Sequence, residues 1–321
     1  MDSGIFGHTS AGQTVAAVRL SAGDLTVRVI ALGSILQSVR LAGVTHDLTL
    51  GADTIADYEK AMPFHGPIVG PVANRITGAA AVIAGRQHRF TPPGAMLLHS
   101  GDAGIHRQVW TLDGATADRA VLTLDLPDGA GGFPGNRRIT AEWRVEAPAT
   151  LRLRLRADTD APTLMNLANH SYWNLDGTDT WSGHRLQVAA GRVLSHRPDG
   201  TVRGPVVPVG ATPYDLRRGP VLRPGAPPFD HCYALADTRR SLTEVLEFTG
   251  RSGVTLHLST TEPGVQVYDG RAARRPGRRP SEGMAFEPQF WPDAPGRPGF
   301  PSILLNPGQA WAQVSEWRFT R

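Results

Sequence analysis

The chain has 321 residues, 40% of them hydrophobic and 19% charged, which suits a sizeable core and excludes a disordered polyelectrolyte. Lys60 is the only lysine, so lysine-based Schiff-base chemistry is not expected, and Cys232, the only cysteine, excludes an internal disulfide and any multi-cysteine metal site. The net charge of +4 comes from scattered arginines with no groove-reading helix or zinc finger beside them, so nucleic acid is not an expected partner.

Alternation of apolar and polar residues with a period of two runs along most of the chain. Residues 151–156 (LRLRLR) show it most clearly, and such a pattern predicts a strand with one buried face. Apart from one short helix at 55–62, the pattern predicts strands at 26–31, 120–126, 139–146, 151–156, 244–249 and 254–259. Turn-forming clusters separate them at 127–129, 198–200 and 262–264. These features predict an all-β antiparallel sandwich or barrel, and the lack of a repeat or linker predicts one domain over 1–321.

The ends and the surface of the chain restrict its location and partners. The start lacks a basic region followed by an apolar run, and no stretch approaches 18 apolar residues. We therefore expect a cytoplasmic protein that does not enter membranes. One dense basic run, residues 271–279, is interpreted either as a solvated loop or as a basic rim near an anionic partner.

Four clusters place polar groups where the strand pattern calls for apolar ones. In an extended segment over 166–175 (NLANHSYWNL), His170 would share a face with Tyr172 and with two asparagines, Asn166 and Asn174, and such a set needs a polar partner or ligand. Glu287 stands among large apolar residues, where the pKa of a carboxyl group should rise. The other two clusters are 229–233 (FDHCY) and 74–76 (NRI).

Taken together, these segments resemble the aldose 1-epimerases, also called galactose mutarotases. The resemblance rests on 169–175 (NHSYWNL), 73–76 (ANRI), 98–101 (LHSG), 287–289 (EPQ), 292–295 (PDAP), 299–302 (GFPS) and 306–308 (NPG). It also includes 210–215 (GATPYD) and 263–268 (PGVQVY), in the same order, and covers nearly the whole chain from about Val27. Pro71 departs from the pattern, because an arginine is usual in that segment.

This resemblance implies a large antiparallel β-sandwich of the galactose mutarotase-like supersandwich type, with a sugar cleft on one sheet face. It implies no organic cofactor and no metal, and a small-molecule monosaccharide as the partner of a monomer or homodimer. His170 matches the general acid of the family and Glu287 its general base. Arg75, His99 and Asp230 match residues that bind sugar hydroxyls, and Gln266 lies in a segment that often lines the cleft. Trp173, Phe290 and Trp291 are candidates for packing on the apolar face of the sugar or in the core.

The chemistry implied is exchange of α and β anomers of free aldoses through ring opening. Opening removes the proton of the anomeric hydroxyl and protonates the ring oxygen, which a base and an acid on opposite sides of the C–O bond could do together. We expect a bell-shaped pH profile with its acid limb set by Glu287 and its alkaline limb by His170, whose pKa a neighbouring carboxylate would raise. Two alternatives remain open at this point, a sugar-phosphate 1-epimerase and a non-catalytic carbohydrate-binding protein of the same fold.

Overall fold

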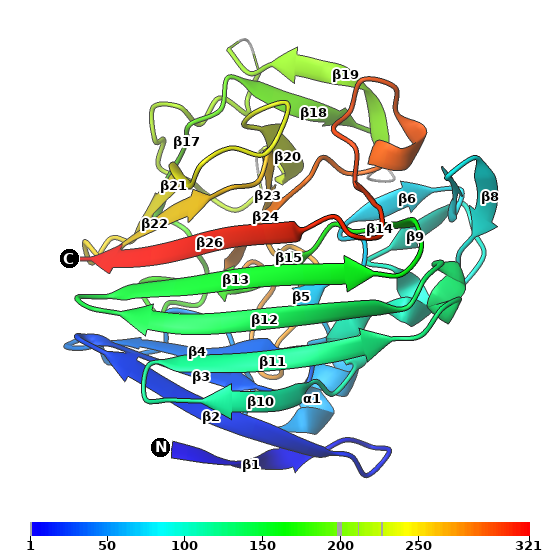
Figure 1. Cartoon of the computed structure of the whole chain (residues 1–321). Helices are drawn as coiled ribbons and strands as arrows, with labels where there is room; N and C mark the ends of the chain where they lie inside the picture. The colour runs from blue at the N-terminus through cyan, green and yellow to red at the C-terminus, as the bar shows by residue number, and fades with distance from the viewer. Residues whose placement is uncertain (1, 198–200, 211, 226) are drawn as a thin grey trace.

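The computed structural model describes residues 2–197, 201–210, 212–225 and 227–321, and strands dominate it (Figure 1). The turn expected at 198–200 lies outside the described residues. In the described part of the chain, no helix has the length and apolar character needed to cross a membrane.

An eight-stranded antiparallel sheet forms the broad face seen in Figure 1. Its strands, in spatial order, are β10 (Thr111–Ala115), β11 (Arg119–Leu126), β12 (Arg137–Glu146), β13 (Thr150–Thr159), β26 (Trp311–Thr320), β22 (Thr255–Thr260), β21 (Thr243–Thr249) and β17 (Arg185–Val188). In β13, Leu151, Leu153 and Leu155 are buried while the intervening arginines reach solvent, as the alternation predicts.

A six-stranded antiparallel sheet packs on the buried face of the larger one. Its order is β16 (Tyr172–Trp173), β24 (Met284–Gln289), β23 (Gly264–Tyr268), β20 (Asp230–Ala234), β18 (Arg192–His196) and β19 (Val202–Pro208). Trp173 meets Trp317 of β26 with ring centroids 6.2 Å apart, and Phe286 meets Phe248 of β21 at 5.0 Å. The two sheets therefore share one core, which is the sandwich expected from the sequence.

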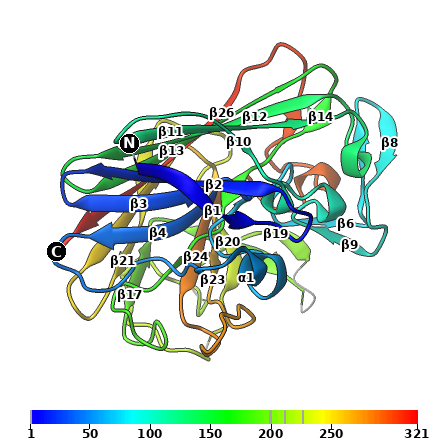
Figure 2. The same cartoon turned by 90° about the horizontal axis from the view of Figure 1, so that it is seen from below.

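A four-stranded sheet at the N-terminal end covers a further part of the same core, and Figure 2 shows it from below. It comprises β1 (Asp2–His8), β2 (Thr14–Ala22), β3 (Leu25–Ile30) and β4 (Ile35–Leu41). Trp143 of β12 donates from Nε1 to Ser34 Oγ at 2.9 Å, which ties this sheet to the eight-stranded one.

Short elements fill the space between the sheets. The two-stranded pairs are β5 (Ile68–Val69) with β15 (Ala168–Asn169), β6 (Arg75–Thr77) with β9 (Met96–Leu98), β7 (Ala80–Ile83) with β8 (Arg86–Arg89), and β14 (Thr163–Leu164) with β25 (Leu304–Leu305). The helical turns are α1 (Ile55–Lys60) and four 3₁₀ turns, η1 (Gly101–Ala103), η2 (Ile105–Arg107), η3 (Ala130–Gly132) and η4 (Ala294–Gly296). Thr54 caps α1 by accepting from the Asp57 amide at 3.2 Å, so the expected helix begins as predicted and ends two residues early.

The expected strands are confirmed with ends that differ by one to three residues, but the segment 166–175 differs from the expectation. It forms two short strands in different sheets: β15 pairs with β5, and β16 pairs with β24. His170 lies at the bend between them. The expected extended run fails because its two halves find separate partners for their backbone hydrogen bonds.

Candidate functional site

A cleft of about 910 Å³ opens on the face of the six-stranded sheet that points away from the core. It is lined from the six-stranded sheet, the β6–β9 pair, the end of α1 and the segment after β23. His170, Glu287, Arg75, His99 and Asp230, all expected from the sequence, line this one cleft. The sixth expected residue, Gln266, lies behind Asp230 instead.

Strand alternation aims Glu287 into the cleft. On β24, Phe286 faces the core shared by the two large sheets, and its neighbour Glu287 therefore points to the opposite face. Gln266 of β23 stands directly across from Glu287 in the antiparallel register. Glu287 is 2% exposed, so its carboxyl group reaches only the floor of the cleft.

His170 is held by backbone contacts with the loop before β5. Its amide donates to the Pro67 carbonyl at 2.8 Å, and its carbonyl accepts from the Gly66 amide at 3.0 Å. Gly66 adopts a φ of +88°, and a Cβ there would come within 2.5 Å of the Leu36 carbonyl oxygen, so this close approach requires glycine. The Asn169 side chain also donates to Gly66, at 2.9 Å. The imidazole of His170 is thus placed by backbone on both sides.

The two groups meet side by side at the floor of the cleft. His170 Nε2 lies 3.5 Å from Glu287 Oε1, and both side chains are buried. Burial lowers the pKa of His170 to about 4 and raises the pKa of Glu287 well above its usual value. Both shifts disfavour the charged forms of the two groups, so burial opposes an ion pair at this contact.

This arrangement corrects one expectation drawn from the sequence. The pKa of His170 is lowered, since desolvation by burial outweighs the raising effects of its backbone hydrogen bond and of Asp230. The two side chains stand next to each other at the floor of the cleft. Adjacent groups suit two oxygens attached to the same carbon, which is what the anomeric hydroxyl and the ring oxygen of a sugar are. The expected rise in the pKa of Glu287 is confirmed.

His99 is fixed by a reciprocal contact between two residues with left-handed backbone. Asn74 has φ +63° and His99 has φ +46°. The His99 amide donates to the Asn74 carbonyl at 2.8 Å, and the Asn74 amide donates to His99 Nδ1 at 3.1 Å. Burial lowers the pKa of His99, so the ring is neutral, and with Nδ1 accepting it carries its proton on Nε2. His99 is therefore a fixed hydrogen-bond donor, and residues strained in this way are frequent at functional sites.

Arg75, Asp230 and Gln266 form a polar chain along the wall. The Asp230 carboxylate accepts from Arg75 Nη2 at 3.2 Å and from Gln266 Nε2 at 2.6 Å. Arg75 also donates to Asn74 Oδ1 at 3.3 Å. Gln266 is 1% exposed, so its part is to hold Asp230 rather than to meet a ligand.

Several buried polar atoms around the cleft have no hydrogen-bond partner within the described residues. They are Glu287 Oε2, His170 Nδ1, Gln266 Oε1, Arg75 Nε and both ring nitrogens of His196. Buried polar atoms are normally satisfied, so a concentration of unsatisfied ones in one cleft indicates a polar ligand. A sugar, with a hydroxyl on nearly every carbon, is such a ligand.

Residues that the sequence reasoning missed complete the wall. Phe64 packs against His99 at 4.9 Å and His170 at 5.8 Å between ring centroids, and Tyr268 approaches Tyr172 at 6.2 Å. His196 and Tyr214 also line the cleft. The family resemblance already covered the segments of Tyr214 and Tyr268, 210–215 and 263–268, whereas no pattern marked Phe64 or His196, which the fold alone brings to the cleft.

The aromatic candidates and the asparagines of 166–175 have structural positions. Trp173 is fully buried in the main core, and Phe290 and Trp291 pack in smaller clusters outside the cleft lining. Asn166 accepts from the Phe290 amide at 2.9 Å, and Asn174 donates to the Glu282 carbonyl at 2.6 Å. Both asparagines therefore hold backbone in place, and only the middle of the segment contributes to the cleft.

His99, His170 and Glu287 also form a possible metal triad, with ligand atoms within 4.8 Å of one another. The fixed state of His99 opposes this use. A metal ion needs the lone pair of Nε2, but the Asn74 amide occupies Nδ1 and leaves the proton on Nε2. In a second group, Glu244, Glu247 and His257, the first residue is exposed and the other two are half-buried, and Glu244 already pairs with Arg318 at 2.9 Å.

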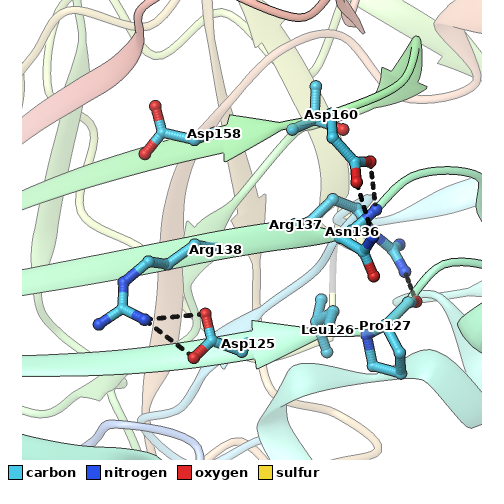
Figure 3. A pocket seen from close by; sticks show the side chains of 9 residues that line it. Asp125, Leu126, Pro127, Asn136, Arg137, Arg138, Asp158 and Asp160 are labelled. Carbon is cyan, nitrogen blue, oxygen red and sulfur yellow. Dashed lines mark hydrogen bonds and ion pairs between the residues drawn. The ribbon is translucent and has the colours of Figure 1, made fainter.

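A second hollow, of about 500 Å³, lies over β11, β12 and β13 on the solvent side of the eight-stranded sheet (Figure 3). Most of its charged groups pair with each other: Arg138 pairs with Asp125 at 2.9 Å, and Asp160 accepts from Asn136 Nδ2 at 2.6 Å, although Arg137 Nη1 has no partner within the described residues. The Arg137 guanidinium donates to the Pro127 carbonyl at 2.9 Å. This mutual pairing marks a surface network rather than a binding site.

Comparison with known proteins gives a consistent result. The model of the family described as aldose 1-epimerase matches residues 16–318. Galactose mutarotase from Mus musculus is 29% identical over 98% of this chain and 97% of its own length. Aldose 1-epimerase from Escherichia coli strain K12 is 27% identical over 92% of each chain. The crystal structure of the GalM/aldose epimerase homologue from C. elegans superimposes with a TM-score of 0.88 at 26% identity, covering 96% of this chain and 99% of the other.

Proposed function

Because this chain belongs to the aldose 1-epimerase family and is an isomerase of the mutarotase type, we propose that it exchanges the anomers of free aldoses, hexoses among them, with His170 and Glu287 as the proton-transfer pair. The observation that carries the assignment of residues is the buried pair at the floor of the cleft, with His170 Nε2 3.5 Å from Glu287 Oε1 and both pKa shifts disfavouring the charged forms. Ring opening consumes one proton at the ring oxygen and releases one at the anomeric hydroxyl, so such a pair needs no proton from solvent.

The proposed course assigns one oxygen of the anomeric carbon to each group. As the sugar binds, the proton of Glu287 passes to His170, and the carboxylate then takes the proton of the anomeric hydroxyl. His170 gives its proton to the ring oxygen, the ring C–O bond breaks, and the open aldehyde forms. Rotation about the bond between C1 and C2 and closure on the other face, with the two roles reversed, give the other anomer.

The remaining residues orient the sugar. His99 donates from Nε2 to a sugar oxygen, and Arg75 with Asp230 holds ring hydroxyls through charge-assisted hydrogen bonds. Gln266 acts as a positioning residue, since its amide fixes the Asp230 carboxylate at 2.6 Å. Phe64 and Tyr172 offer apolar faces on which the carbon side of the sugar can pack.

Further expectations about the protein as a whole belong to this proposal. The four-, six- and eight-stranded sheets share one core, which supports a single domain over 1–321. The lone cysteine Cys232 is buried, which suits a cytoplasmic location. A monomer or a homodimer is compatible with the proposal, because the cleft is built from one chain.

Polarimetry on freshly dissolved sugars tests this function. We expect the protein to accelerate the approach to anomeric equilibrium for α-glucose and α-galactose, measured against heat-denatured protein at the same concentration. A panel of pentoses then defines the range of sugars. Treatment with EDTA should leave the rate unchanged, since no step uses a metal. Sugar binding without any acceleration would contradict the proposal and favour a carbohydrate-binding protein of the same fold.

A further inference from the structure

The wall of the cleft is rich in cations. Five cationic side chains line it, against two carboxyl groups, Asp230 and Glu287. The cations are Lys60, Arg75, Arg197, Arg271 and Arg274. Burial raises the pKa of Glu287, which disfavours the negative charge of this carboxyl group.

These cations come from separate parts of the chain. Lys60 is the last residue of α1, Arg197 follows β18, and Arg271 and Arg274 belong to the segment after β23. The end of α1 and the segment after β23 nevertheless line the same cleft. Lys60, Arg197, Arg271 and Arg274 are exposed, whereas His170 and Glu287 are buried at the floor, so these four cations lie toward the mouth of the cleft.

Ion pairing divides the cations into two groups. Arg75 is paired with Asp230 at 3.2 Å, and Arg271 is paired with Asp269. Within the part of the chain that the structure describes, Lys60 and Arg274 have no carboxylate partner, and Arg197 donates only to uncharged oxygens, those of Thr201 and Val202, at 3.4 and 3.2 Å.

The neighbours of Arg274 in the basic run behave differently. Arg275 pairs with Glu282, and Arg278 lies 3.6 Å from both Asp179 and Glu282. Arg275 and Arg278 of the basic run are therefore paired with carboxylates outside the cleft, and Arg271 is paired with Asp269. Arg274 lines the cleft with no carboxylate partner within the described residues.

The cleft is also larger than one sugar ring needs. Its volume of about 910 Å³ is near the upper end of the range for pockets that enclose drug-sized ligands, about 300–1,000 Å³. With the anomeric carbon held at His170 and Glu287 on the floor, the far end of an aldose points toward the mouth. Cations that line a concave, partly desolvated opening attract anions strongly, and arginine and lysine are the residues that bind phosphate and carboxylate groups.

We propose that the mouth of the cleft binds an anionic group at the end of the aldose remote from its anomeric carbon, with Lys60, Arg197 and Arg274 as the binding residues. This inference rests on the proposed function, because it places the anomeric carbon at the His170–Glu287 pair. The shared chemistry is a phosphate or carboxylate on the sugar, so aldose phosphates or hexuronates are the preferred substrate class and neutral hexoses are poorer substrates.

The test compares three sugars by NMR exchange spectroscopy at anomeric equilibrium, in a buffer free of phosphate and with the uncatalysed rate of each sugar subtracted. The sugars are glucose, glucose 6-phosphate and glucuronate. We expect a kcat/KM for at least one anionic sugar about tenfold above that for glucose, the size of one or two hydrogen bonds to a charged group. Added salt should reduce this preference.

Variants then locate the effect. Lys60→Gln and Arg274→Gln should each lower the ratio of kcat/KM for the anionic sugar to that for glucose by about fivefold to tenfold. Arg274→Lys should restore much of it. Arg279→Gln is the matched control, since Arg279 belongs to the same basic run but does not line the cleft, and its ratio should equal that of the unchanged protein.

The possible outcomes distinguish this inference from the proposed function, anomer exchange, on which it rests. A preference for glucose 6-phosphate alone identifies a phosphate site, and a preference for both anionic sugars identifies a general anion site. Rapid exchange of glucose with no preference for either anion, or a ratio unchanged in Lys60→Gln and Arg274→Gln, would overturn the inference and leave the proposed function intact. No acceleration for any of the three sugars would overturn both.

Discussion

At the scale of single residues, burial controls the His170–Glu287 pair more than mutual attraction does. Taking both groups out of water disfavours their charged forms, which lowers the pKa of His170 and raises the pKa of Glu287, so the proposed course starts with the proton on the carboxyl group. The catalytic requirement is one proton on the pair as a whole. Activity should be lost on either side of the range in which that condition holds.

A requirement for one proton on the pair predicts a bell-shaped pH profile of kcat/KM. The acid limb then belongs to His170 and the alkaline limb to Glu287, the reverse of the order that their ordinary pKa values would give. As pH falls, His170 takes up a second proton near its pKa of about 4, so kcat/KM drops there. As pH rises, the remaining proton is lost from Glu287 at its raised pKa, so kcat/KM drops again. Rates with α-galactose across pH 3.5 to 10 provide the measurement.

The His170→Asn variant identifies the limbs. Its residual activity should lack the acid limb and keep the alkaline one, because Glu287 is still present. A profile that loses its alkaline limb instead would show that His170, not Glu287, carries the last proton. Survival of both limbs would assign the acid limb to another group of the cleft, such as His196 or His231, whose pKa values burial lowers to about 3 and about 4.

At the scale of elements, the β6–β9 pair positions the side chains that we propose to bind the sugar. Asn74 precedes β6, His99 follows β9, and their reciprocal hydrogen bonds require left-handed backbone at both positions. Asparagine tolerates this conformation better than most residues, and glycine tolerates it best. The backbone of position 74 thus links the stability of the pair to the orientation of the His99 ring.

Two substitutions at Asn74 separate backbone strain from loss of the side chain. Asn74→Gly and Asn74→Ala both remove the contact with Arg75, but only alanine meets the steric penalty at φ +63°. We expect the free energy of unfolding of Asn74→Ala to be about 1 kcal/mol below that of Asn74→Gly, measured by urea denaturation. The KM for galactose should be higher in the alanine variant. Equal stabilities would mean that the loop relaxes and that His99 is held by other contacts.

Individual elements also show which features of the fold and of the cleft could be predicted from the sequence and which could not. The alternation in residues 151–156 predicts a strand, because a shift of one residue in its pairing would bury arginine side chains. Glu287 is recognisable as a functional candidate, because a carboxyl group buried among phenylalanines is costly unless it is paired or used. The break at His170 could not be foreseen, because it depends on β5 and β24, partners that are distant in sequence. The contact of Asn74 with His99 and the gathering of cations from α1 and the segment after β23 depend on tertiary structure in the same way.

At the scale of the whole molecule, the cleft makes folding sensitive to acid. Burial lowers the pKa of several imidazoles in and beside it, His65, His106 and His196 to about 3 and His170 and His231 to about 4. Unfolding exposes these rings and returns their pKa to about 6.5, so the unfolded chain binds more protons than the native one below that pH. Stability is therefore complete above pH 6.5 and is lost as pH falls toward 4.

We expect the urea midpoint to fall steeply between pH 7 and pH 5, because one such imidazole alone lowers the free energy of unfolding by about 2 kcal/mol over that range. His106 is 4% exposed, and both of its ring nitrogens lack a hydrogen-bond partner within the described residues. A His106→Leu variant should accordingly show a shallower fall. A midpoint independent of pH in the unchanged protein would mean that these rings already carry protons in the native state.

The central claim is that Glu287 and His170 transfer the protons of anomer exchange, and the exchange rate of the Glu287→Gln variant tests it most directly. Glutamine keeps the shape of the side chain but cannot accept the hydroxyl proton. NMR exchange spectroscopy with galactose, paired with calorimetric titration of the same sugar and a thermal melt to verify folding, gives rate, affinity and integrity together. We predict a rate lower by about 10²- to 10⁴-fold with affinity changed by less than about threefold. Exchange at a rate near that of the unchanged protein would contradict the account, since Glu287 would then not be the base.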